Sequence, residues 1–482
     1  MEPIADTSSQ TDEPKSPIGP IFRILEADHL NFRSEEDVFK FQNEPGPARP
    51  LSIRMAVSER LSQATVLHFL ANTANWIETL VISGIIQNQM PLPPMPSLKK
   101  LDISYYCGRN CTEENVYTFD ALTTLIIRGG DAFPFNVPLL TKLQVNCGVP
   151  LARDRLLRFL TQCPLLEILG VGYNEGVGEE YYNCNQDIEM MDYDQEIYPA
   201  VDLPHLRLFY SHSAKKNEHI LLFNNLTLPP SCAVVFNYCR RLNTLSSHYP
   251  LPLAGIKRVR LKTRNGNGAV ELIDDENNHR VYVVTNMNPC GQDPDQAVSN
   301  QITIASYASF LRGLGANTVD VLFVEGSFPW SPSRADDVLS FLGETCKKLV
   351  LSGSVAAHYL RALAPEPIGN IDESEVDWRC PTLTELVVYA HNRIDPDDTD
   401  ISSLLPQITK RRKVADMPIR TISLFVHDPQ GESLENLPEQ LCKSGVEHVK
   451  VVKGVDALSW DIDSDFFDGL DIQTYRESHG DV

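Results

Sequence analysis

Apolar residues recur along this chain in the pattern Leu-x-x-Leu-x-Leu, with Ile, Val, Phe or Cys replacing some leucines, about twelve times. Spacings of three and then two residues suit a short strand whose apolar side chains point to one side. One such unit cannot bury its apolar side alone, so successive units must stack. The runs begin at Ile77, Leu98, Leu122, Leu140, Leu166, Leu206, Ile256, Val319, Cys346, Leu383, Ile419 and Val446.

Segments with apolar residues every three to four positions alternate with these runs and predict helices. Residues 51–55 alternate like a further strand, and Ser58 is a suitable N-cap for the first helix. Helices are predicted over residues 58–74, 154–162, 305–314, 334–346 and 432–443. The alternation predicts an α/β leucine-rich-repeat solenoid, a horseshoe with parallel strands on the concave face and helices outside.

The repeats are irregular in the middle of the chain, where strand starts lie about 40 to 63 residues apart. There, Asn265-Gly266-Asn267-Gly268 separates alternating strands and predicts an inserted β-hairpin or meander. We expect a disordered leader over 1–20, a remnant N-terminal segment over 21–50 with a strand at 21–25, a repeat domain over 51–455, and an acidic cap or tail over 456–482. A cap is favoured, because the end of a stack exposes apolar surface.

Charge and composition narrow the functional classes. Lys plus Arg number 42 against 64 Asp plus Glu, a net charge of −22, which opposes general binding to nucleic acid or anionic membranes. No apolar run approaches a membrane span of about 20 residues, and the N-terminus does not resemble a signal peptide. We therefore expect a soluble protein of the cytoplasm or nucleus. Its 11 cysteines fit small buried residues in a reducing compartment.

No arrangement of residues predicts catalysis, a cofactor or a metal site. The glycine-rich run from Gly170 to Gly178 is followed by Glu179 and Glu180, which would repel a phosphate. Cys107 and Cys111 lack the second Cys or His pair that zinc requires. The histidines form no H-E-x-x-H motif. The chain is thus predicted not to be an enzyme; the alternative is an enzyme that uses the acidic, tyrosine-rich segment 179–198.

The strand positions that alternate with the leucines predict a binding surface. If the leucines point inward, the second, fourth and sixth residues after each run's first apolar residue line the concave face. Three of these residues are acidic: Asp102, Glu325 and Glu385. Eight are basic: Lys100, Arg128, Lys142, Arg258, Arg260, Lys262, Lys348 and Lys450. Four are aromatic: Tyr210, Phe323, Tyr389 and Phe425.

These twelve basic and aromatic residues predict a concave face that binds a protein partner with an acidic surface. The alternative is chance, because three of the basic residues come from one strand. The compact run Lys410-Arg411-Arg412-Lys413 lies in a predicted polar connection. It fits a nuclear import signal or a contact for an acidic partner, although a solvated loop is the favoured interpretation.

Several segments carry a family resemblance. They are Pro50 to Met55, Trp76 to Gly84, Pro96 to Ile103, and two helix-to-strand junctions, Cys163-Pro164-Leu165-Leu166-Glu167 and Cys380-Pro381-Thr382-Leu383-Thr384-Glu385. In these segments, which span most of residues 50–455, the chain resembles the repeat region of the large fungal, basidiomycete-type F-box/leucine-rich-repeat family.

The resemblance implies a substrate receptor of a ubiquitin ligase. In that family the F-box binds the Skp adaptor and the repeats hold the substrate. Here no Leu-Pro-led helical trio of F-box type precedes Leu51, which puts Skp binding in doubt. We therefore expect non-catalytic protein recognition, either in a ligase or as a leucine-rich-repeat scaffold without a ligase role.

Overall fold

The structure is a computed structural model, and it divides the chain into two compact units. One contains Met1–Gly130 and Pro134–Val137, and the other contains Asp131–Phe133 and Pro138–Val482. The structure describes residues 30–42, 50–84, 91–104, 116–128, 135–147, 153–173, 200–211, 222–236, 256–264, 267–274, 279–286, 319–326, 332–353, 355–363, 378–390, 401–426 and 436–453. The predictions for residues 1–20, 21–25, 179–198, 305–314 and 456–482 fall outside these ranges.

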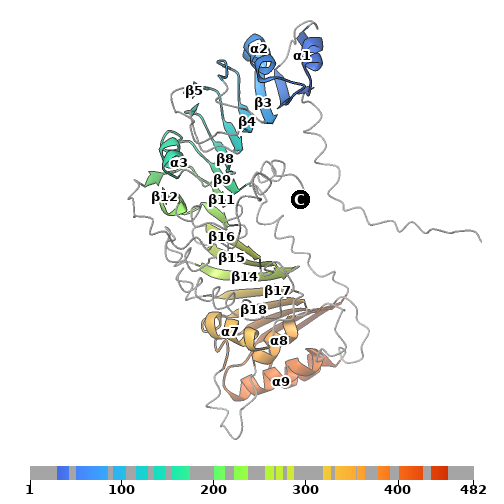
Figure 1. The fold of residues 1–482 in the computed structure, drawn as a ribbon. Helices are drawn as coiled ribbons and strands as arrows, with labels where there is room; N and C mark the ends of the chain where they lie inside the picture. The colour runs from blue at the N-terminus through green and yellow to red at the C-terminus, as the bar shows by residue number, and fades with distance from the viewer. Residues whose placement is uncertain are drawn as a thin grey trace, which may run out of the picture. The chain divides into compact units, whose positions relative to one another are not determined.

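The N-terminal unit is built on a parallel sheet with the strand order β1-β2-β3-β4-β6; strands β3 and β4 are labelled in Figure 1. Its strands are β1 (Leu30–Phe32), β2 (Leu51–Val57), β3 (Ile77–Gly84), β4 (Lys100–Ser104) and β6 (Thr124–Arg128). Its helices are α1 (Glu35–Gln42), α2 (Gln63–Thr73) and the 3₁₀-helix η1 (Ala74–Trp76). Two short strands, β5 (Tyr117–Thr118) and β7 (Phe135–Asn136), pair separately.

The segment before Leu51 takes part in this unit through β1 and α1. Strand β1 pairs with β2 in parallel. The rings of Phe32, Phe41 and Phe69 lie 5.0–5.8 Å apart and join β1, α1 and α2. Aromatic packing of this kind buries a large apolar area. Residues 30–42 therefore cover apolar side chains of β2 and α2 at the β1 edge of this sheet.

Helix α2 begins four residues later than the sequence predicts. Ser62, not Ser58, is its N-cap, and the Ser62 hydroxyl accepts a hydrogen bond from the backbone N–H of Thr65 at 3.2 Å. The carboxylate of Glu35 accepts hydrogen bonds from the hydroxyls of Ser62 and Thr65, at 2.9 and 2.7 Å. These bonds lower the pKa of Glu35. Ser58 instead forms an isolated bridge with Leu61, so its predicted role was wrong.

The C-terminal unit is also organised around a large sheet, in which most neighbours are parallel. Its strand order is β8-β9-β11-β13-β16-β15-β14-β17-β18-β19-β20-β21. The strands are β8 (Lys142–Cys147), β9 (Ile168–Tyr173), β11 (Leu208–Ser211), β13 (Ala233–Phe236), β14 (Ile256–Arg264), β15 (Asn267–Asp274), β16 (His279–Asn286), β17 (Val321–Gly326), β18 (Lys348–Gly353), β19 (Glu385–Ala390), β20 (Thr421–Val426) and β21 (His448–Lys453). Two short strands, β10 (Val201–Asp202) and β12 (Leu226–Thr227), pair separately.

All twelve predicted apolar runs coincide with strands, and their leucine positions align between neighbours. Leu349 pairs with Leu386, which pairs with Ile422, and all three are fully buried. Likewise, Leu143 pairs with Leu169 in parallel. The period-two alternation of a strand thus places equivalent apolar residues side by side in one dry layer. The prediction of an α/β fold with parallel strands is confirmed.

The predicted insertion is a three-stranded meander. Strand β14 pairs antiparallel with β15, and β15 pairs antiparallel with β16. The meander is part of the main sheet, because β16 runs parallel to β13 and β14 runs parallel to β17. Buried Val259, Leu272 and Val281 continue the apolar layer through it.

Helices line the C-terminal unit between strands (Figure 1). Those in the described residues are α3 (Arg153–Leu160), α7 (Pro332–Leu342), α8 (Ala356–Ala362), α9 (Ile401–Val414) and α10 (Leu437–Lys443). Helix α8 packs on β18 and β19, and α7, α8, α9 and α10 pack in sequence.

One predicted connection is instead a helix. Residues 410–413 lie in the last turns of α9, which continues through Pro406. Arg412 is completely buried, whereas Lys410 is exposed. The interpretation of this run as a solvated loop was therefore wrong. Basic residues are favourable near a helix C-terminus, because the helix dipole is negative there.

Candidate functional site

Most parallel strands of the C-terminal unit are held in register by a similar backbone contact just before they start. The carbonyl oxygen of Lys347 accepts hydrogen bonds from the N–H groups of Thr384 and Glu385, at 2.9 and 3.0 Å. The carbonyl oxygen of Asp320 accepts in the same way from Lys347 and Lys348. This repeated contact fixes which side of each strand faces the leucine layer.

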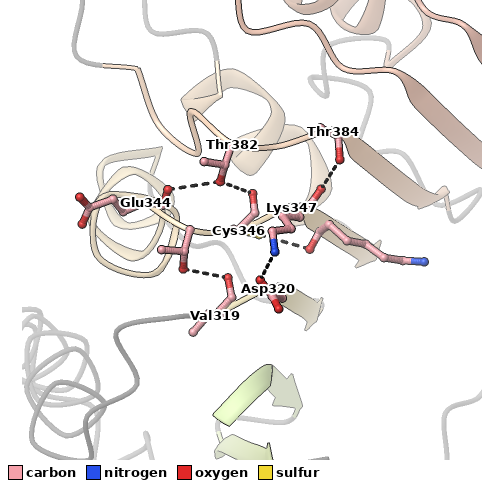
Figure 2. Close-up of polar contacts among 9 residues, drawn as sticks. Val319, Asp320, Glu344, Cys346, Lys347, Thr382 and Thr384 are labelled. Carbon is pink, nitrogen blue, oxygen red and sulfur yellow. Dashed lines mark hydrogen bonds and ion pairs between the residues drawn. The ribbon is translucent and has the colours of Figure 1, made fainter. Parts of the chain in front are cut away.

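Threonine side chains and ion pairs reinforce these contacts, as Figure 2 shows. The hydroxyl of Thr382 lies 3.2 and 3.1 Å from the carbonyl oxygens of Glu344 and Cys346. The hydroxyl of Thr384 donates to the carbonyl oxygen of Lys347 at 3.3 Å. The ammonium of Lys347 pairs with Asp320 at 2.9 Å. Side chains on the opposite side of the sheet are therefore presented on a rigid scaffold.

The side of β14 and β17–β21 opposite the leucine layer is here called the outward face. Five of its residues form a continuous apolar patch, in which Phe323 and Phe425 are partly exposed and Val350, Val387 and Tyr389 are buried. Phe323, Val350 and Val387 follow one another across β17, β18 and β19 in register. The rings of Tyr389 and Phe425 stack with centroids 4.6 Å apart and planes inclined by 12°. Burial raises the pKa of Tyr389.

Three of the predicted site residues, Phe323, Tyr389 and Phe425, thus come together in the apolar patch. Val350 and Val387 occupy the same alternating positions, although they are neither basic nor aromatic. Valine at these outward positions was the missed signal. The patch is therefore more apolar than the predicted basic surface.

Two cations flank the apolar patch. The guanidinium of Arg260 lies 5.7 Å from the ring centroid of Phe323, and the ammonium of Lys450 lies 5.8 Å from that of Phe425. Both distances suit a cation–π contact. Lys450 is exposed. Arg260 and Lys450 come from strands on opposite sides of the patch, so each aromatic end carries a positive group.

Carboxylates neutralise part of the predicted basic surface. Arg260 donates to Glu271 on β15 at 3.0 Å, and these side chains retain only 11% and 4% of their exposure. Lys348 pairs with Glu385 at 2.7 Å. In the N-terminal unit, Arg128 forms a bidentate pair with Asp102, at 2.9 and 3.0 Å. Counting charges along single strands missed these pairs.

The remaining predicted residues are more scattered. Lys100 begins β4 and Lys142 begins β8, and both are partly buried. Lys100 and Arg128 belong to the N-terminal unit, not to the unit that carries the apolar patch. Arg258 lies on β14, in register with Val321. Tyr210 is buried to 7% exposure and offers little surface to a partner. Lys262 lies on β14, but its side chain is outside the described residues.

Two of the described cysteines, Cys163 and Cys232, are poor nucleophiles. Cys163 and Cys232 are buried, and burial raises the pKa of each thiol to about 12. Cys346 and Cys380 are also buried, and hydrogen bonding to Cys346 together with burial raises the pKa of Cys380. Only the thiolate reacts readily. Within the described ranges, no group of three or more His, Cys, Asp or Glu residues is arranged to hold a metal ion.

Thiol reactivity provides a direct test of this burial. We expect iodoacetamide at pH 8 to alkylate exposed Cys442 within minutes and to leave Cys163 and Cys232 largely unmodified in the folded chain. Peptide-resolved mass spectrometry after timed quenching measures each site separately. The control is the same reaction in urea, where all three sites should react. Equal native rates at Cys442 and Cys163 would contradict the packing of the helix-to-strand junction.

Comparisons with known proteins add no family assignment. No known family model matches the chain, and no curated protein is similar to it in sequence. In the described parts of the chain, no helix has the length and apolar character needed to cross a membrane.

Proposed function

We propose that this chain is a non-catalytic protein-recognition scaffold of the leucine-rich-repeat type. Parallel strands with aligned buried leucines, joined through recurrent backbone contacts, support a solenoid in which each repeat contacts its neighbours. In this proposal the outward face is the concave surface. A partner protein binds there, as it does in the substrate-binding part of the F-box/leucine-rich-repeat receptors that the sequence resembles.

The observation that carries this proposal is the apolar patch on the outward face. Phe323 and Phe425 are only partly buried and pack against Val350, Val387 and Tyr389. Aromatic residues on a rigid scaffold are frequent anchors of protein interfaces, because they bury a large area at small entropic cost. The flanking cations and the ion pair of Lys348 with Glu385 supply a polar rim.

Affinity purification tests the proposal. We expect tagged wild-type chain to capture a specific protein that the double variant Phe323→Ala/Phe425→Ala loses by at least tenfold, measured by quantitative mass spectrometry. A matched control is Lys410→Ala/Lys413→Ala on α9, which should capture the same protein as the wild type. Charge reversal of Arg260 is a poorer test, because it leaves Glu271 buried without its partner.

The same purification distinguishes a ligase receptor from a scaffold without a ligase role. Co-purification of a Skp-type adaptor that persists in the double variant supports a receptor, because the adaptor would bind away from the outward face. Capture of the outward-face partner without an adaptor supports a scaffold. If the wild type and the double variant capture the same proteins in equal amounts, recognition through the outward face is excluded.

A further inference from the structure

The inference developed here rests on the proposed function and specifies its partner. We propose that the apolar patch binds an extended peptide segment of a partner protein, in which a large apolar side chain is followed within two or three residues by a carboxylate. The apolar side chain contacts the exposed part of Phe425, and the carboxylate meets Lys450.

The dimensions of the outward face suit an extended peptide. The patch and its flanking cation extend from Phe323 on β17 to Lys450 on β21, which are separated by four strand intervals. Neighbouring strands lie about 4.8 Å apart, so this distance is roughly 19 Å. An extended chain advances about 3.3 Å per residue. A segment of about six residues therefore covers the patch.

Among the described residues, an unpaired cation lies at one end of the patch. The guanidinium of Arg260 already pairs with Glu271 in a nearly buried contact. Lys450 is exposed, and no carboxylate of the described residues lies within ion-pair distance of it. Its ammonium is also held over Phe425. A carboxylate placed beside an apolar anchor would therefore gain an ion pair at Lys450 without displacing an existing one.

The neighbouring positions on β20 and β21 favour the same orientation. Ser423 pairs in register with Lys450, and Thr421 pairs with His448. These side chains are small or basic, and none is a carboxylate. The acidic residues of the outward face, Glu325 and Glu385, lie on β17 and β19. The β21 end is therefore the more favourable end for a negative group on the peptide.

A random heptapeptide display library panned against the full wild-type chain tests this partner chemistry. We expect enrichment of sequences with Phe, Leu or Trp followed within three residues by Asp or Glu. Fluorescence polarisation of one enriched peptide, and of its copy with Asn or Gln replacing the acids, then gives two affinities. Phe425→Ala should weaken both peptides about 30-fold, whereas Lys450→Glu should weaken the acidic peptide about tenfold and the amide copy less than twofold.

Exposed Lys410→Glu on α9 is the matched control for the charge change and should leave both affinities unaltered. Libraries without enriched peptides, enrichment without acids, or an acidic peptide indifferent to Lys450→Glu would each overturn the inference. So would a dimer of the wild type that Phe425→Ala dissociates, since the patch would then join two copies. If affinity purification still shows a protein partner lost on Phe323→Ala/Phe425→Ala, the proposed function survives this failure.

Discussion

Replacing Arg412 with alanine is expected to lower the free energy of unfolding by about 3–5 kcal/mol. The side chain is completely buried. Its guanidinium donates to the carbonyl oxygens of Arg379 and Cys380, at 2.8 and 2.6 Å, and to that of Met417 at 3.3 Å. Alanine would leave these acceptors buried without donors and open a cavity. Urea denaturation followed by circular dichroism measures the loss.

Two further variants separate the hydrogen bonds from the helix itself. Lys410→Ala, on the exposed side of α9, should change the unfolding free energy by less than about 0.5 kcal/mol. Arg412→Lys keeps a cation but lacks the planar fork, so it should be nearly as destabilising as alanine. A urea midpoint for Arg412→Ala equal to that of Lys410→Ala would show that α9 is not tied to the β19 junction in this way.

Alanine at Gly353 is expected to cost about 3 kcal/mol of stability. Gly353 ends β18 with φ +87°, and a Cβ there would lie 2.1 Å from the carbonyl oxygen of Gly326. The backbone oxygen cannot move without breaking the parallel pairing of β17 with β18. Left-handed backbone strain and a steric clash therefore act together.

Ser352→Ala is the matched control for Gly353→Ala, because it changes the preceding residue and should alter stability by less than about 0.5 kcal/mol. Thermal denaturation of both variants gives the comparison. Gly84 at the end of β3 has the same geometry, with φ +107° and a Cβ contact of 2.1 Å to the oxygen of Val57. Its alanine variant should therefore behave similarly. Unchanged melting of Gly353→Ala would contradict the close approach of the two strand ends.

The sequence predicted the strands well because each carries its own signal. Leu349, Leu386 and Ile422 repeat the same spacing, and burial of one apolar side is enough to set which residues point inward. Helices were harder to predict. The pattern in α9 is interrupted by Pro406 and ends in a basic run, so its one buried arginine has no local signal.

The candidate site was predicted only in part, because the sequence signal lies within single strands. Alternation along single strands found Phe323, Tyr389 and Phe425, but it contained no information on neighbours across the sheet. The pair of Arg260 with Glu271 depends on the register of β14 and β15. The Asn265-Gly266 turn signal could have supplied that register, because a two-residue turn there places residues 260 and 271 opposite each other. The pairs of Lys348 and Arg128 required the repeat register as well.

The meander has a consequence for how this sheet tolerates change. Strands β13, β16, β14 and β17 all run in one direction, and only β15 runs against them. Removing β15 and β16 together would leave β13 and β14 with matching polarity and with Val234 and Val259 facing the same layer. The β15–β16 hairpin is thus a module that can be gained or lost without inverting the repeats on either side. The number of strands in this sheet can therefore change in evolution while the apolar residues of the remaining strands keep facing the same layer.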